Sequence, residues 1–303
     1  LAEREDALQA AVKALRDGAV VAVKGIGGFH LMTDARNGEA VRRLRVRKKR
    51  DEKPFALLFP NLESIAAVCE VSSAEQSWLE SVAAPIVLLK KRNDAFPLAT
   101  EVAPGLSWLG AMLPYSPLHH LLMQELGFPV VATSGNLTDE PICVEFEEAL
   151  PRLGGIADFF LTHNRPIARP MDDSVMTLCD GEPLILRRGR GLSPYSIPMP
   201  GSPDGLLAAG AQMKSAVAIT SGGRAVMSPH IGDLDHEGAA HLWTRTVRDL
   251  TELHGLKPIQ VVTDLHPNYA STACAIELGI PIMQVQHHHA HIAGCMAENE
   301  LEG

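Results

Sequence analysis

Short continuous apolar runs and amphipathic stretches alternate along residues 1–195. Each run holds four to six residues rich in Val, Leu and Ala, which is typical of strands buried on both faces of a sheet. These expected strands are residues 19–24, 55–59, 85–90, 128–132 and 158–161. Between them, apolar residues recur every three or four positions, which predicts helices at 3–16, 37–49, 61–69, 73–83, 119–125 and 145–153. The alternation predicts an α/β domain.

Two stretches break this pattern. Residues 97–117 mix prolines and glycines with many apolar side chains, so we expect an ordered loop rather than a solvated linker. Residues 193–203 carry four prolines within ten positions, which favours a stiff, extended segment. We therefore place a linker at 196–204, between a domain at 1–195 and a second domain at 205–303.

The second domain has a different order of elements. Apolar runs predict strands, and longer amphipathic stretches predict helices between the later ones. The expected order is strand 206–209, strand 216–221, strand 225–228, helix 236–254, strand 259–264, helix 268–278 and strand 281–286. This is the order of one lobe of an actin-like ATPase fold, which needs two lobes, so we expect the first lobe of an incomplete domain.

Composition narrows the class of protein. The formal net charge of −9 argues against a general nucleic-acid binder, which is expected to be basic. The five cysteines contain no C-x-x-C pair, which disfavours a disulfide framework or zinc knuckle and favours a reducing cytoplasm. No apolar run approaches the roughly 20 residues of a membrane span. The start at Leu1, without an initiator Met or signal peptide, suggests an excised or processed chain.

A dense basic stretch precedes the expected strand at 55–59. Five Lys or Arg residues fall within 47–53, although the whole chain is acidic. In the preceding helix, Ala40, Val41 and Leu44 share one face, and we expect the arginines on the other. Basic groups here suit a polyanion such as a nucleoside triphosphate. They also suit a solvated helix end, where positive charge complements the helix dipole.

Two other stretches have polar chemistry next to strands. Residues 133–138 (T-S-G-N-L-T) follow the strand at 128–132, where open α/β sheets bind ligands, although turns use the same residue types. Residues 163–190 hold five arginines among Gly and Pro. These suit bidentate contacts to phosphate or carboxylate, or surface pairs with Asp172, Asp173 and Asp180. Three glycines at 25–28 permit close backbone approach, but match neither a dinucleotide fingerprint nor a Walker A loop.

A histidine run stands at the end of the last expected strand. If a helix begins there, His287 and His291 lie four positions apart and share one helix face. Two imidazoles at that spacing are half of a divalent metal site, and a histidine-rich core patch without metal is the alternative. No further ligand is evident within the 303 residues.

Taken together, these motifs resemble one family, the hydrogenase maturation carbamoyltransferases called HypF. The resemblance covers essentially the whole chain: a YrdC-like domain with a twisted mixed sheet and helices, then the first lobe of a Kae1-like (actin-like, ASKHA) domain. The motifs are residues 24–30, 47–55, 133–136, 163–167, 172–174, 187–190, 210–214, 230–233 and 287–291. The family's acylphosphatase-like domain, zinc-finger module and second Kae1-like lobe have no counterpart in these residues.

The resemblance implies an activity. ATP and carbamoyl phosphate would give carbamoyl adenylate with release of pyrophosphate and phosphate, and the carbamoyl group would pass to the C-terminal cysteine of HypE. It implies ATP, Mg²⁺ and a divalent Fe or Zn ion as cofactors. Two alternatives remain: a threonylcarbamoyl-adenylate synthase acting in tRNA modification, and a non-catalytic RNA- or protein-binding YrdC module. The fused Kae1-like half argues against the former.

The resemblance also implies site residues. Lys53 and Arg50 would be catalytic. The nucleotide would be bound by Lys48, Arg50, Lys53, Thr133, Ser134 and Asn136. Carbamoyl phosphate or phosphate would be bound by Lys24, His30, Arg165, Arg169, Arg187, Arg188 and Arg190. The metal would be held by His287 and His291.

Overall fold

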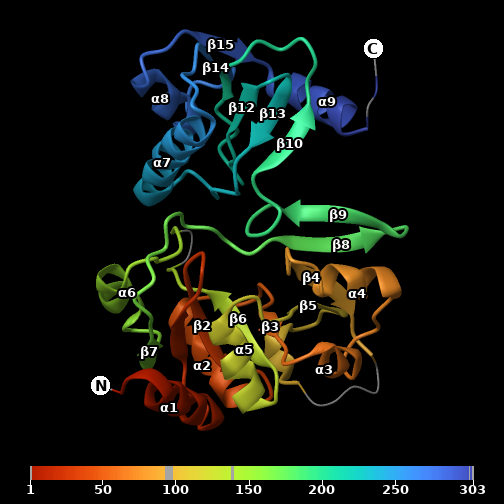
Figure 1. The fold of residues 1–303 in the computed structure, drawn as a ribbon, viewed down its shortest axis with the longest axis vertical. Coiled ribbons are helices and arrows are strands. Elements are labelled where there is room, and N and C mark those ends of the chain that lie inside the picture. Colours follow the sequence, from red (N-terminus) through yellow and green to blue (C-terminus); the bar gives the residue numbers. More distant parts are fainter. Residues whose placement is uncertain (1, 93–97, 138–139, 300, 302–303) are drawn as a thin grey trace. The chain divides into compact units, whose positions relative to one another are not determined.

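The computed structural model describes residues 2–92, 98–137, 140–299 and 301 (Figure 1). Backbone contacts divide the chain into two compact units. The first ends at Leu192 and the second begins at Ser193, with residues 140–141 grouped with the second. Each unit has its own sheet, so each is described by itself. The domain limits expected from the sequence (1–195 and 205–303, with a linker at 196–204) and the function expected for each domain remain predictions.

The first unit is built on a mixed nine-stranded sheet. Its order is β7-β1-β2-β6-β3-β5-β4-β8-β9, with parallel pairing at β1/β7, β3/β5 and β4/β8 and antiparallel pairing elsewhere. The strands are β1 (Val21–Lys24), β2 (Phe29–Asp34), β3 (Ala56–Leu58), β4 (Ile86–Lys90), β5 (Trp108–Met112), β6 (Val130–Ser134), β7 (Phe159–Leu161), β8 (Val175–Cys179) and β9 (Glu182–Arg187). The expected α/β class with a mixed sheet is confirmed.

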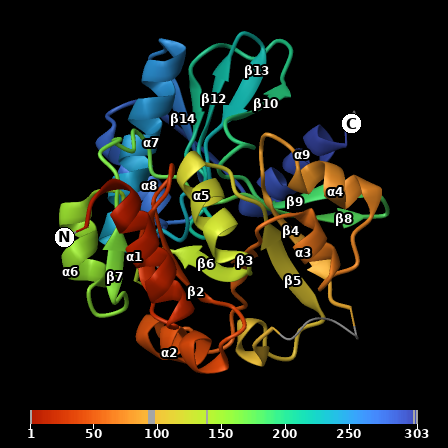
Figure 2. The ribbon, with the colours of Figure 1, turned by 60° about the horizontal axis from the view of Figure 1, so that its bottom comes forward.

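Helices cover both faces of this sheet (Figure 2). They are α1 (Arg4–Arg16), α2 (Gly38–Lys48), α3 (Leu62–Ala66), α4 (Ser73–Leu79), α5 (Pro117–Leu126) and α6 (Phe146–Leu153). Successive side chains of β1 alternate between the two cores: Val21 and Val23 pack with α1 and α5, and Ala22 packs with α2 and α6. Burial on both sides explains why these strands read as unbroken apolar runs.

The structure corrects the expected loop at 97–117. Within its described residues, 98–117, it contains a 3-10 turn, η1 (Thr100–Val102), and strand β5, which pairs with β3 and β4. Pro104 and Pro114 lie outside the strand and cost it no hydrogen bond. Gly110 lies within it and leaves room for Ile86, whose Cγ2 would be 2.9 Å from a Cβ at this position. Residue Pro97 of the expected loop lies outside the described residues.

The hairpin of β8 and β9 is not predicted by the apolar pattern of the sequence. Its turn is Asp180–Gly181, with φ values of 52° and 84°, the positive pair that a two-residue type I′ turn requires. Asp-Gly between strands is the signal that could have found it. The hairpin matters because it carries Arg187 and leads directly to Arg190.

The second unit has a six-stranded sheet in the order β10-β13-β12-β11-β14-β15. Strands β11, β14 and β15 run parallel, as the expected actin-like lobe requires. The elements are β10 (Tyr195–Pro198), β11 (Leu206–Ala208), β12 (Ala218–Ser221), β13 (Arg224–Met227), α7 (Glu237–His254), β14 (Gln260–Asp264), α8 (Ala270–Glu277), β15 (Ile282–Val285) and α9 (His287–Glu298). The fully buried Trp243 of α7 anchors the core and donates to the Ala209 carbonyl at 2.8 Å.

Part of the proline-rich run belongs to this second sheet. Residues 195–198 form β10, which pairs antiparallel with β13. Pro198 is tolerated because β10 is an edge strand, where one side needs no ladder hydrogen bonds. The run is therefore extended only over residues 195–198, where strand pairing begins inside the expected linker, and residues 199–202 turn, with Ser202 N–H donating to the Met199 carbonyl at 3.2 Å. None of the described helices combines the length and apolar composition needed to cross a bilayer.

Candidate nucleotide site and histidine pair

Several strand ends of the first unit meet at one edge of its sheet. The antiparallel register pairs Lys24 of β1 with Phe29 of β2, and His30 with Ser134 at the end of β6. Strand β3 runs antiparallel to β6, so the basic loop before β3 comes to the same edge. Residues far apart in the sequence are thus placed side by side by strand pairing.

Lys48, at the end of α2, ties this loop to the end of β6. Its Nζ donates to Asn136 Oδ1 at 2.8 Å and to the Asn136 carbonyl at 3.0 Å, and it also contacts the Ser134 carbonyl. The Ser134 hydroxyl donates to the same Asn136 Oδ1 at 2.8 Å. Burial, reinforced by the positive charge of Arg50, lowers the pKa of Lys48 to about 7. Lys48, Ser134 and Asn136 therefore form one hydrogen-bonded group.

Arg50 reaches the same strand end from the basic loop. Its Nη1 donates to Thr133 Oγ1 at 3.2 Å, and its guanidinium lies 4.8 Å from the Phe55 ring centroid. Burial lowers the pKa of Arg50 to about 10, with further contributions from Arg45 and Arg187. The positive charge of Arg187, on the β8–β9 hairpin, is therefore close enough to Arg50 to lower its pKa. Lys53, by contrast, is an exposed side chain, and its carbonyl accepts from Arg50 Nε at 3.1 Å.

Arg45 is buried on the apolar face of α2, so the prediction that the arginines of this helix lie on its other face is wrong for this residue. It is 6% exposed and lies on the same face as Val41, four positions earlier. It is buried because backbone oxygens surround it: its guanidinium donates to the carbonyls of Arg50, Asp51, Lys53, Glu101 and Val102. Arg45 therefore fixes the shape of the basic loop that positions Arg50. The four-residue spacing from Val41 was the available signal.

A buried network lies beside this edge. Asp173 accepts from Arg190 Nε at 2.9 Å through one oxygen and lies 3.0 Å from His30 Nε2 through the other. His30 Nδ1 lies 3.1 Å from the Tyr115 hydroxyl, and the Arg190 guanidinium stacks 3.4 Å from the Tyr115 ring centroid. Burial alone raises the pKa of the Asp173 carboxyl, but His30 and Arg190 together hold it well below its usual value. Asp173 is therefore a buried carboxylate with two partners.

The network contains residues that the sequence reading did not assign to the site. Tyr115 and Asp173 are among them, and His119 packs 4.5 Å from Tyr115 between ring centroids. Burial, with the nearby charge of His30, lowers the pKa of His119 to about 3, so it is neutral at physiological pH. Only Asp173, beside Ser174 in the motif at 172–174, stood out in the sequence. Nothing near Tyr115 or His119 marks them before the fold is known.

The predicted phosphate-binding residues lie in three different surroundings. His30 and Arg190 belong to the buried network, and Arg187 Nε donates to the Asp173 carbonyl at 2.9 Å. Lys24 is buried at the end of β1, with Nζ 3.8 Å from Glu145 Oε2, and Arg188 is half-buried. Arg165 and Arg169 are exposed in the segment after β7. The fold brings His30, Arg187 and Arg190 together, and the phosphate-binding roles stay a prediction.

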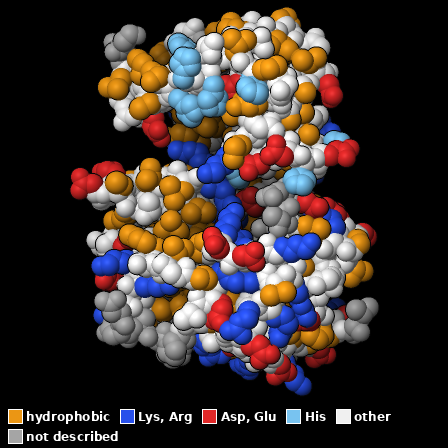
Figure 3. All heavy atoms as spheres, turned by 180° about the vertical axis from the view of Figure 1, so that it is seen from behind, with side chains coloured by type: hydrophobic (Ala, Val, Ile, Leu, Met, Phe, Trp, Pro, Cys, Tyr) orange, Lys and Arg blue, Asp and Glu red, His pale blue; other side chains and the backbone are white. Residues whose placement is uncertain are grey.

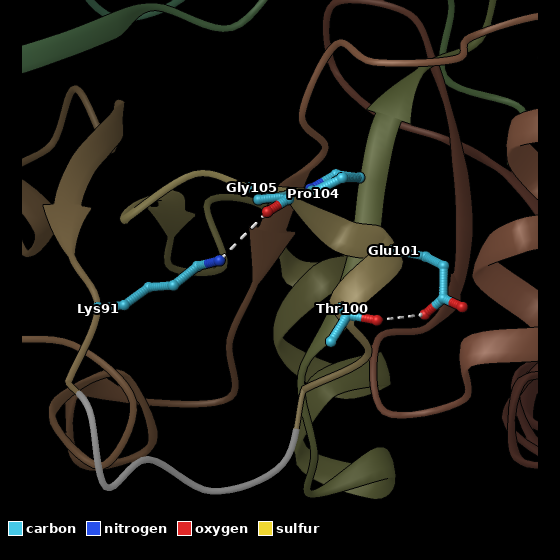
Figure 4. Close-up of a pocket in the computed structure, with 6 residues that line it drawn as sticks. Lys91, Thr100, Glu101, Pro104 and Gly105 are labelled. Carbon is cyan, nitrogen blue, oxygen red and sulfur yellow. Dashed lines mark hydrogen bonds between the residues drawn. The ribbon is translucent and has the colours of Figure 1, made fainter.

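A surface hollow lies elsewhere in the first unit (Figure 4). Lys91 points across it and donates to the Ala103 carbonyl at 3.3 Å, and Thr100 donates to Glu101 at 3.2 Å. Its lining residues are Lys91, Thr100, Glu101, Ala103, Pro104 and Gly105. None of the predicted nucleotide or phosphate residues lines it.

The histidine run of the second unit begins helix α9, so the condition for a shared helix face is met. His287 is its first residue, so His287 and His291 share one face, and their Nε2 atoms lie 3.1 Å apart. His287 Nδ1 lies 3.1 Å from Asp264 Oδ2. Figure 3 shows histidine side chains gathered on the surface of this unit, and His287 and His291 are exposed.

The distance between the Nε2 atoms of His287 and His291 is close to that between two nitrogen ligands of one metal ion. Tetrahedral zinc with Zn–N bonds of about 2.0–2.1 Å separates its ligand nitrogens by about 3.3 Å. The observed 3.1 Å between the two Nε2 atoms fits that spacing. Among residues 2–92, 98–137, 140–299 and 301, no cluster of three or more His, Cys, Asp or Glu side chains could hold a metal. The pair thus fits half of a metal site.

Comparison with known proteins matches both units. A family model described as "Telomere recombination" (Sua5, YciO and YrdC) matches residues 13–189, and a model described as "HypF Kae1-like domain" matches residues 202–298. The carbamoyltransferase HypF of Synechocystis sp. is 45% identical over 300 residues, which are 99% of this chain and 39% of the relative.

Two solved structures show the same fold. One is full-length HypF in a phosphate- and nucleotide-bound form, with 44% identity and a TM-score of 0.95 over all of this chain and 40% of that one. The other is HypF of T. kodakarensis, with 35% identity and a TM-score of 0.93 over 99% of this chain and 40% of that one. The chain spans about two fifths of the length of these relatives. It belongs to the HypF family, with a YrdC-like unit followed by part of a Kae1-like unit.

Proposed function

We propose that this chain forms carbamoyl adenylate from ATP and carbamoyl phosphate, as part of a carbamoyltransferase. Carbamoyl phosphate and water give carbamate and phosphate. A carbamate oxygen then attacks the α-phosphorus of ATP, and the bond to the β-phosphate oxygen breaks to release pyrophosphate. Membership in the HypF family supports this activity, as does the phosphate- and nucleotide-bound form named for one relative.

The observation that carries the proposal is the convergence of Lys48, Arg50, Ser134 and Asn136 at one sheet edge. Attack on an α-phosphate requires positioning and neutralisation of triphosphate charge, with little covalent chemistry from the protein. Lys48 and Arg50 would neutralise the phosphates, with Mg²⁺ bound to ATP sharing that role. Ser134 and Asn136, with Thr133, would orient the nucleotide. The exposed Lys53 would close over the phosphates from the loop.

The carbamate or carbamoyl phosphate would lie against the arginines of the hairpin. Arg187 is held by its bond to the Asp173 carbonyl and lies near enough to Arg50 to lower its pKa. This shared positive field suits a second anion next to the triphosphate. Arg190 and His30 both contact the Asp173 carboxylate, so we propose that they fix the conformation of the site around Arg187.

We further propose that the second unit takes part in carbamoyl transfer to the C-terminal cysteine of HypE. His287 and His291 would hold a divalent Fe or Zn ion through their Nε2 atoms. A bound ion of this kind supplies Lewis-acid polarisation of a carbonyl oxygen. Completion of the transfer belongs to the whole enzyme, of which this chain spans about two fifths.

Pyrophosphate release tests the activity. ATP turnover that requires carbamoyl phosphate supports the proposal. Turnover that instead requires threonine and bicarbonate would assign the chain to threonylcarbamoyl-adenylate synthesis, and RNA binding without turnover would assign it to a binding module. Lys53→Ala should weaken ATP binding, measured by calorimetry, without unfolding the protein, because the side chain is exposed. Lys90→Ala, which removes an exposed lysine paired with Glu70, is the matched control.

A further inference from the structure

Asp264 is a buried carboxylate at the carboxyl end of β14. It is 7% exposed, and its Oδ2 lies 3.1 Å from His287 Nδ1. The parallel register of β14 and β15 pairs Asp264 with Val285, two residues before His287. Strand pairing therefore places this carboxylate beside the first residue of α9.

We propose that Asp264 is a positioning residue that holds His287 as the Nδ1–H tautomer and turns its Nε2 towards His291. A carboxylate only accepts hydrogen bonds, so the imidazole must donate from Nδ1. The lone pair of a neutral His287 then lies on Nε2, which is 3.1 Å from Nε2 of His291. The His287 side chain is 49% exposed, so packing restrains its ring only in part, and the hydrogen bond supplies the missing restraint.

The same contact has a consequence for metal affinity. A carboxylate behind a ligating histidine fixes the ring and makes its free nitrogen a better donor, and loss of such a partner typically weakens metal binding by about 10–100-fold. This consequence rests on the proposed metal role of His287 and His291. The tautomer and orientation of His287 do not depend on it.

The tautomer is measured directly by NMR of the ¹⁵N-histidine-labelled, metal-free 303-residue chain. His287→Ala identifies the His287 signals. In the wild type we expect neutral His287 to carry its proton on Nδ1, and Asp264→Ala should shift it towards the Nε2–H form. An unchanged tautomer in Asp264→Ala overturns the proposal. If that variant does not fold, Asp264→Leu, which has a larger side chain and accepts no hydrogen bond, provides the same comparison.

Zinc binding is then measured with Zn²⁺ alone in competition with a chromophoric chelator. Asp264→Ala should weaken binding by about 10–100-fold. Asp204→Ala is the matched control, because Asp204 precedes β11, at the opposite end of the parallel strands, and bonds only the Gly222 backbone N–H among the contacts described. Equal zinc affinity of wild type and Asp264→Ala would overturn the positioning role. A wild type that binds no zinc would instead refute the metal pair, and the tautomer would still decide the role of Asp264.

Discussion

The buried carboxylate of Asp173 should be the most sensitive single position of the first unit. In Asp173→Asn the shape is kept, but the charge between Arg190 and His30 is lost. All three residues are 5–8% exposed, and the two contacts are 2.9 and 3.0 Å long. Removing one partner from a buried pair costs about 3–5 kcal/mol, because the other charge stays buried without compensation. We expect the unit to lose about that much stability.

The measurement must separate the two units, because a chain of two units need not unfold in one step. Hydrogen exchange is followed by mass spectrometry along a urea series. The exchange of peptides from β1 and β2 gives the unfolding midpoint of the first unit. Peptides of α7 give an internal reference, and we expect their midpoint to stay unchanged. For a unit of this size, the same loss should lower the melting temperature by about 6–20 °C.

Asp172→Asn is the matched control, because it is the neighbouring residue and is only half-buried. We expect it to change stability by no more than about 0.5 kcal/mol.

The dependence of stability on acid provides a second test. The lowered pKa of Asp173 contributes stability above the ordinary carboxyl pKa of about 3.9, and that stability is lost as the pH falls below it. Equal midpoints for the two variants, or an unchanged acid dependence in Asp173→Asn, would refute the reasoning.

Three further predictions concern the same unit. Arg45→Lys should destabilise it by about 3 kcal/mol in urea, since lysine cannot serve the five carbonyls that Arg45 contacts; a change below about 0.5 kcal/mol would contradict this. ATP affinity should be greatest below pH 7 and fall as the pH rises, because Lys48 loses its charge; calorimetry should show proton uptake on binding in wild type and none in Lys48→Met. Gly189→Ala should cost about 1–3 kcal/mol by thermal melting, because its Cβ would lie 2.1 Å from the Asp172 carbonyl, whereas Gly155→Ala meets nothing within 4 Å.

The sequence by itself determined the type and approximate place of most elements. Strands such as β1 and β6 are buried on both faces, so their apolar runs are visible without any knowledge of neighbours. Helix α9 begins where the histidine run begins, which places His287 and His291 on one face by helical periodicity alone. These features depend on local pattern, and local pattern is what a sequence displays. The resemblance to the HypF family rested on motifs of the same kind.

Only the tertiary structure decided which side chains meet. β5 was hidden because its short apolar run lies among prolines and glycines that indicate a loop, and its pairing with β3 and β4 is what identifies it as a strand. Helical spacing places Arg45 on the face of Val41, but only the fold supplies the five carbonyls from separate segments that make its burial possible. Asp173 and Tyr115, 58 positions apart, join one network through His30 and Arg190. A charged group is buried only where distant partners compensate its lost hydration, and the fold alone supplies those partners.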